Sequence, residues 1–117
     1  YFCKFNSVSV DSDGNIYSAG YQVGTEEFTY GTGVTATGTG GSNVVLVKFS
    51  SSGTAQWART VTAGSGDNRF FSISADSAGN VYAAGYQEFL ETYTYGTGVN
   101  ATGVFYGYNA VLVKYAQ

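Results

Sequence analysis

Apolar and polar residues alternate along much of the chain with a period of two, which is typical of β-strands. Val8 and Val10 alternate with Ser7 and Ser9, and a turn at residues 11–14 leads into a second alternating run. The pattern predicts strands at residues 7–10, 15–21, 43–49, 55–61, 72–75, 80–86 and 109–115. The run at 43–49 is continuously apolar, so it is expected to be covered on both faces. No helix of two or more turns is expected.

The segment between residues 23 and 42 is rich in glycine and predicts a long loop between the second and third strands. Its residues 28–30 are expected either to add a short strand or to pack back on the sheet.

A repeat organises the whole sequence. The segment 5–22 recurs as 70–87, so that Asp11 corresponds to Asp76, 65 positions later. From residue 5 to residue 38 about two thirds of the positions are identical in the two copies. One inserted residue follows, after which 43–49 corresponds to 109–115 at an offset of 66. The chain therefore contains two copies of one structural unit.

Four antiparallel strands in each unit are the anatomy of a β-propeller blade. The blocks Val-Asp-Ser-x-Gly-Asn-x-Tyr, Ala-Gly-Tyr, Val-Leu-Val-Lys-Phe and Gln-Trp-Ala-Arg-Thr resemble the seven-bladed β-propeller repeat (SBBP repeat) of bacterial proteins. The resemblance implies an all-β fold, with a complete first blade in residues 1–65 and a second in residues 66–117. The second blade lacks a counterpart of residues 56–60, its outer strand. The resemblance also implies a secreted or cell-envelope location.

Composition narrows the classes of partner. A formal net charge of −3 with five scattered basic residues leaves no basic patch for a nucleic acid. No apolar run approaches the roughly 20 residues that a membrane helix needs, so membrane insertion is not expected. A signal peptide would have to lie outside this sequence. The single cysteine, Cys3, predicts no internal disulfide.

The turn Asp11-Ser-Asp-Gly-Asn15 has the alternating oxygen ligands that suit calcium. The alternative is a hairpin turn in which the aspartate accepts hydrogen bonds from the turn itself. Ala78 replaces Asp13 in the second copy, which favours the turn. No metal and no cofactor are therefore expected.

Catalytic chemistry has few candidates in this sequence. There is no histidine, so a nucleophile would lack its usual base. Glu26, Glu27, Glu88 and Glu91 could in principle form a glycosidase pair, but only Glu26 and Glu91 correspond between the copies. A fragment of a propeller glycosidase remains a remote alternative to a protein without enzymatic activity.

Tyrosines dominate the candidate binding residues. Tyr30, Tyr95, Tyr106 and Tyr108 fall in the predicted loops, and tyrosine suits both sugar stacking and protein interfaces. The alternative is that the repeated aromatics pack one blade against the next. The favoured hypothesis is a non-catalytic repeat scaffold that binds a protein or glycan through these loops.

Self-assembly is the second hypothesis, because fewer than two complete blades leave flat faces and strand edges uncovered. Copies would associate head to tail into a ring or a filament. The residues predicted to exchange or add strands are Tyr1, Phe2 and Lys4 at the start of the chain, and Val111 and Val113 in the last strand.

Overall fold

The computed structural model describes residues 2–116, and none of these residues is helical. The expectation of an all-β chain is confirmed. In chain order the strands are β1 (Cys3–Val10), β2 (Ile16–Val23), β3 (Glu27–Gly31), β4 (Val34–Thr37), β5 (Ser42–Phe49), β6 (Ala55–Thr60), β7 (Asn68–Ala75), β8 (Val81–Glu88), β9 (Thr92–Gly96), β10 (Val99–Thr102) and β11 (Tyr108–Tyr115).

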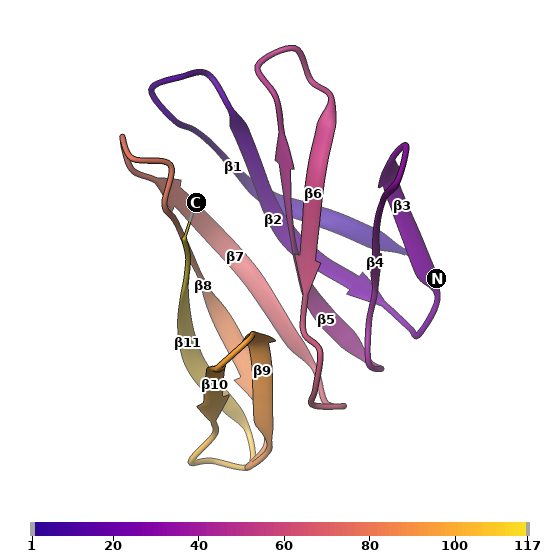
Figure 1. Ribbon diagram of the computed structural model, residues 1–117. Helices are drawn as coiled ribbons and strands as arrows, with labels where there is room; N and C mark the ends of the chain where they lie inside the picture. The colour runs from indigo at the N-terminus through magenta and orange to yellow at the C-terminus, as the bar shows by residue number, and fades with distance from the viewer. Residues whose placement is uncertain (1, 117) are drawn as a thin grey trace.

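These strands form two larger sheets and two hairpins, all antiparallel (Figure 1). The first sheet has four strands in the order β1-β2-β5-β6, and the second has three in the order β11-β8-β7. Hairpins β3–β4 and β9–β10 connect the second and third strands of the respective sheets. Each copy of the repeat thus gives one sheet and one hairpin.

Every strand predicted from the alternation is present, but β1 and β7 begin earlier than expected. A bulge between Phe5 and Ser7 shifts the register of β1, and Phe70 and Ser72 bracket the same bulge in β7. The bulge breaks the period of two, so the pattern could not reveal residues 3–6 as part of the strand. The backbone of Lys4 lies directly against Gly20, where a Cβ atom would clash with the Lys4 carbonyl.

The glycine-rich segments predicted as loops form the hairpins β3–β4 and β9–β10, and residues 28–30, expected either to add a short strand or to pack back on the sheet, lie in β3. Thr32 and Gly33 make the tight turn of the first hairpin, and Gly33 adopts a φ of 71° that favours glycine. Hairpin β3–β4 packs on the first sheet through β6. Ala36 is buried there with Val45 and Val47.

The two sheets pack against each other, with β7 lying against β1, β2 and β5. A single apolar cluster joins them, and its fully buried aromatic members are Tyr17, Phe70 and Tyr93. Hairpin β9–β10 is tied to the segment after β6 by a bridge between Ala63 and Thr94. No helix in the described part of the chain is long and apolar enough to cross a membrane.

Candidate functional site

The interface between the two sheets is made by equivalent strands of the repeat. The Asn6 side-chain amide donates to the Phe70 carbonyl at 2.8 Å, and the Ala75 N–H donates to Ser9 Oγ at 3.1 Å. The Val44 N–H donates to Asn68 Oδ1 at 2.7 Å. These bonds satisfy polar groups at the margin of the apolar contact and fix how the sheets are placed.

Arg69 closes one end of this interface. Its guanidinium lies over the Tyr21 ring, 4.2 Å from the centroid, and donates to Ser42 Oγ at 3.1 Å. Because the Tyr21 ring is buried, both the cation–π attraction and the hydrogen bond to Ser42 hold the guanidinium in place. In the repeat, Lys4 corresponds to Arg69, and Tyr86 corresponds to Tyr21.

The first sheet buries the face that it turns to its neighbour. Leu46 lies opposite Ala19, and Val44 lies opposite Tyr21, so these side chains share one face. All four are buried, with exposed fractions of 0 to 7%. The second sheet of the structure is what covers them.

The second sheet exposes the equivalent face. Leu112 lies opposite Ala84, and Ala110 lies opposite Tyr86. Leu112 is 69% exposed, whereas its counterpart Leu46 is fully buried. We call these four residues the Leu112 face. Its aromatic rings continue to Tyr108, whose centroid lies 4.5 Å from that of Tyr86.

The first sheet in turn exposes the side that the second sheet uses for packing. Phe5, Val8 and Val10 on β1 are 40%, 62% and 56% exposed, and we call them the Val8 face. Their counterparts include Phe70 and Ile73, which are 0% and 8% exposed in the interface. The molecule therefore carries both halves of its internal interface a second time, unpaired and at opposite ends of the pair of sheets.

The predicted binding tyrosines divide into two groups. Tyr30 and Tyr95 do not lie in loops but in the hairpins, where their hydroxyls donate to the side-chain oxygens of Gln22 and Gln87. Tyr95 is 2% exposed, so its ring offers little surface for a ligand to stack on. Burial raises the pKa of both hydroxyls.

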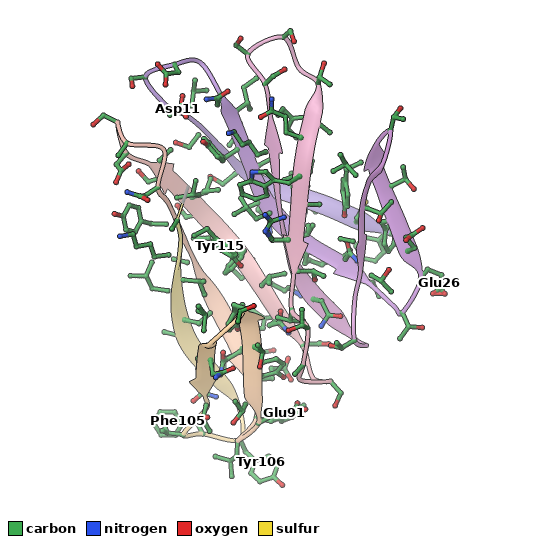
Figure 2. The ribbon with its side chains drawn as sticks, viewed as in Figure 1. Asp11, Glu26, Glu91, Phe105, Tyr106 and Tyr115 are labelled. Carbon is green, nitrogen blue, oxygen red and sulfur yellow. The ribbon has the colours of Figure 1, made fainter. Side chains whose placement is uncertain are left out.

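Tyr106 and Tyr108 are exposed, at 76% and 68%. Tyr106 belongs to a loop at one end of the molecule that also carries Phe105, and Figure 2 shows both at the end opposite the Asp11 turn. Phe89 meets Tyr106 edge to face, with centroids 6.1 Å apart. The structure does not bring Tyr30 or Tyr95 into this loop.

The residues predicted for strand exchange also have defined places. Lys4 pairs with Tyr21 within β1 and β2, and the Phe2 carbonyl accepts from the Val23 N–H. The start of the chain is thus already engaged, so donating it elsewhere would break these bonds; Tyr1 lies outside the described residues. Val111 and Val113 point into the core, while the backbone of β11 forms an edge of the second sheet.

The two Asp turns have one hydrogen-bond pattern. The Asp11 carboxylate accepts from the N–H groups of Asp13 and Asn15 and from the Asn15 amide and Tyr17 hydroxyl. The Asp76 carboxylate accepts from the same four positions of its own copy, although Ala78 replaces Asp13. Among residues 2–116, no three metal-binding side chains gather.

Glu91 holds a loop of the chain. Its carboxylate accepts from the N–H groups of Ser65 and Gly66 at 2.7 and 3.0 Å, and from the Ser65 hydroxyl. The Ser65 N–H is the main cause that holds the pKa of Glu91 below its ordinary value of 4.5. This carboxylate, one of the glycosidase candidates, therefore ties the segment after β6 to the second hairpin.

We expect the stability of the protein to fall in acid. Burial raises the pKa of Asp11, but hydrogen bonds from Asn15, Tyr17 and the backbone outweigh it and lower the pKa below 3.8. The pKa of Asp76 is also lowered, chiefly by the hydrogen bond that its carboxylate accepts from the Asn80 N–H. A carboxylate whose pKa is lower in the folded than in the unfolded protein stabilises the fold at pH values above its unfolded pKa. The contributions of Asp11 and Asp76 are therefore complete above about pH 5 and are lost as the pH falls through their folded pKa values.

Urea unfolding between pH 6 and pH 2.5 measures this loss. Asp76→Asn should unfold more easily at pH 6 and depend less on pH than the wild type. The exposed Asp13→Asn is the matched control and should follow the wild type. A wild-type stability that is flat between pH 5 and 2.5 would contradict the role of these carboxylates.

Two buried glutamines were missed by the sequence analysis. The Gln22 amide donates to the Ala36 carbonyl, and the Gln87 amide donates to Ala101 in the same way. Each glutamine thus fastens its hairpin to its sheet. Their conservation between the two copies was the available signal, because a polar residue repeated inside a buried strand needs partners.

A comparison of the chain with models of known protein families finds no match, and a comparison with curated proteins finds no match either.

Proposed function

We propose that the chain is a non-catalytic scaffold of β-propeller blades that stacks on further blades of the same kind through its Val8 and Leu112 faces. The first sheet with its hairpin is one blade, and the second sheet with its hairpin is the next. A blade from another copy would bring its Val8 face to the Leu112 face of this one.

The observation that carries this proposal is the asymmetry of burial between equivalent residues. Leu46 is fully buried and Leu112 is 69% exposed, while Ile73 is 8% exposed and Val8 is 62% exposed. Each exposed face is apolar and contiguous and has the same kind of residues as one side of the internal interface. Each can therefore bind the complementary face of another blade. Because the two halves differ, the contact is head to tail and can repeat.

The polar margin of the interface is repeated as well. In the repeat, Lys4 corresponds to Arg69, the residue whose guanidinium lies over Tyr21. Tyr86 corresponds to Tyr21 and is exposed enough to receive a cation from a neighbouring blade. Tyr108 occupies the position of Ser42, the hydrogen-bond acceptor of Arg69. The free faces therefore match in charge and aromatic character as well as in apolar surface.

A non-catalytic role fits the placement of the acidic side chains. The Glu91 carboxylate is occupied by Ser65 and Gly66, and the Asp11 and Asp76 carboxylates are occupied by their own turns. On this scaffold, the exposed loop with Phe105 and Tyr106 is the surface best suited to a protein or glycan ligand, since it offers aromatic rings to solvent.

Sedimentation velocity over a concentration series tests the proposal. Burying about 500 Å² of apolar surface on each face is worth on the order of 10 kcal/mol before the cost of association, so we expect larger species at micromolar concentrations. The sedimentation coefficient should rise with concentration without a plateau at the dimer, because each added copy leaves one free face of each kind. A single 12.3 kDa species up to 1 mM would contradict stacking.

A further inference from the structure

A groove lies along the open edge of β11, separate from the two stacking faces. Its cavity of about 250 Å³ is bounded by Val113 and Tyr115 of β11, Tyr95 and Gly96 of β9, and Trp57 and Arg59 of β6. Figure 2 labels Tyr115 in the space between β11 and β6. The edge strand has no neighbour on this side among residues 2–116, so its backbone can pair with an added strand.

The first copy of the repeat shows what occupies the equivalent place. There β6 pairs with β5, so that Thr60, Arg59, Ala58 and Trp57 lie opposite Val45, Leu46, Val47 and Lys48. Ala55 and Ala58 face hairpin β3–β4 and pack in its apolar cluster. The occupant of the first site is thus an extended segment with small residues on its hairpin side.

The equivalent glycines Gly31 and Gly96 differ in how closely a neighbouring strand approaches them. A Cβ atom on Gly31 would come within 2.6 Å of the Ala55 Cβ, so the glycine is required by the strand beside it. A Cβ atom on Gly96 would meet only Val99, at 3.8 Å, which is an ordinary contact. Val34 is 8% exposed under its strand, whereas its counterpart Val99 is 42% exposed.

Tyr115 supplies an independent observation. Its hydroxyl is buried at the groove and has no hydrogen-bond partner in the described part of the chain. The equivalent residue in the first copy is Phe49, which has no hydroxyl to satisfy. A buried hydroxyl without a partner is costly, and an occupant of the groove can provide one.

We infer that this groove binds an extended segment with the pattern Ala-Gln-Trp-Ala-Arg-Thr of β6 as a fourth strand of the second sheet. Its threonine would lie opposite Val111, its second alanine opposite Val113 and its tryptophan opposite Lys114. The first alanine would lie against Gly96, and the backbone would reach the Tyr115 hydroxyl. This is recognition by strand addition, in which the backbone provides affinity and the small residues provide specificity.

A peptide with the sequence of residues 54–61, acetylated and amidated and carrying a fluorophore, tests the inference by anisotropy with the full chain. We expect saturable binding of one peptide per chain with a dissociation constant of about 10 to 100 µM. Amide shifts in an NMR titration should concentrate on β11. The same peptide with Ala58→Trp should bind at least about tenfold more weakly, since a bulky side chain would face hairpin β9–β10.

Gly96→Ala is the decisive protein variant. The added methyl group fits the free chain, so the melting temperature should not change. The methyl group should lower the affinity for the peptide at least about tenfold, because it fills the place of the peptide's first alanine. Gly107→Ala, at a site open to solvent, is the matched control and should bind as the wild type. Equal affinity for Gly96→Ala and wild type, shifts at another strand edge, or no binding at 1 mM would overturn the inference. Stacking through the Val8 and Leu112 faces can fail without affecting this result.

Discussion

Phe70→Ala should destabilise the protein by about 3 to 5 kcal/mol, whereas the equivalent change Phe5→Ala should cost about 1 kcal/mol. The two phenylalanines have matched neighbours in their own copies. Phe70 meets Tyr95 and Tyr115 with centroids 6.2 Å away, and Phe5 meets Tyr30 and Phe49 at 5.9 and 6.4 Å. The two side chains differ in burial, since Phe70 is fully buried and Phe5 is 40% exposed.

Thermal unfolding at concentrations where sedimentation shows only monomer measures this difference. A loss of 3 kcal/mol should lower the melting temperature of Phe70→Ala by about 10 °C or more. If that variant does not fold, the milder pair Phe70→Leu and Phe5→Leu keeps the comparison available. Equal losses at the two positions would show that the first sheet does not cover Phe70 in solution, and the packing of the two sheets would then be wrong.

Val8→Asp should abolish association of the chain while leaving the monomer as stable as the wild type. Val8 is 62% exposed, so the carboxylate stays in water in the monomer. In a stacked pair it would take the place that Ile73 holds in the internal interface, where an unpaired charge is strongly unfavourable. A penalty of about 3 kcal/mol or more weakens the association at least about 100-fold.

Leu112→Asp should have the same effect from the other face, since Leu112 is 69% exposed and corresponds to the buried Leu46. Ser52→Asp lies in the exposed turn between β5 and β6, outside both faces, and serves as a charge-matched control. Val8→Asp species that sediment as the wild type would show that association uses another surface.

The larger sheets could be predicted from the sequence because their strands alternate regularly and occur twice. Of the hairpins, only a short strand at residues 28–30 was among the expectations, and these residues lie in β3. The complete hairpins could not be predicted, since glycine-rich segments such as residues 31–33 favour turns and conceal the short alternations on either side. Four-residue alternations are too short to distinguish a strand from a loop without the tertiary contacts.

The candidate site was only partly accessible from the sequence. Equivalent residues such as Leu46 and Leu112 have the same type and local pattern, and only the packing of the sheets reveals that one is buried and the other free. Likewise Tyr95 and Tyr106 are both tyrosines in predicted loops, but one lies in a hairpin core and the other is exposed. Burial is set by contacts between the copies, which a single copy's pattern does not contain.

Mixing the two charged variants tests head-to-tail stacking most directly. Val8→Asp retains an intact Leu112 face, and Leu112→Asp retains an intact Val8 face. Each variant alone should sediment as a monomer of 12.3 kDa, and an equimolar mixture should form a complex of twice that mass and nothing larger, because both outer faces are blocked. A mixture that stays monomeric where the wild type associates, or variants that each still assemble alone, would contradict stacking through these two faces.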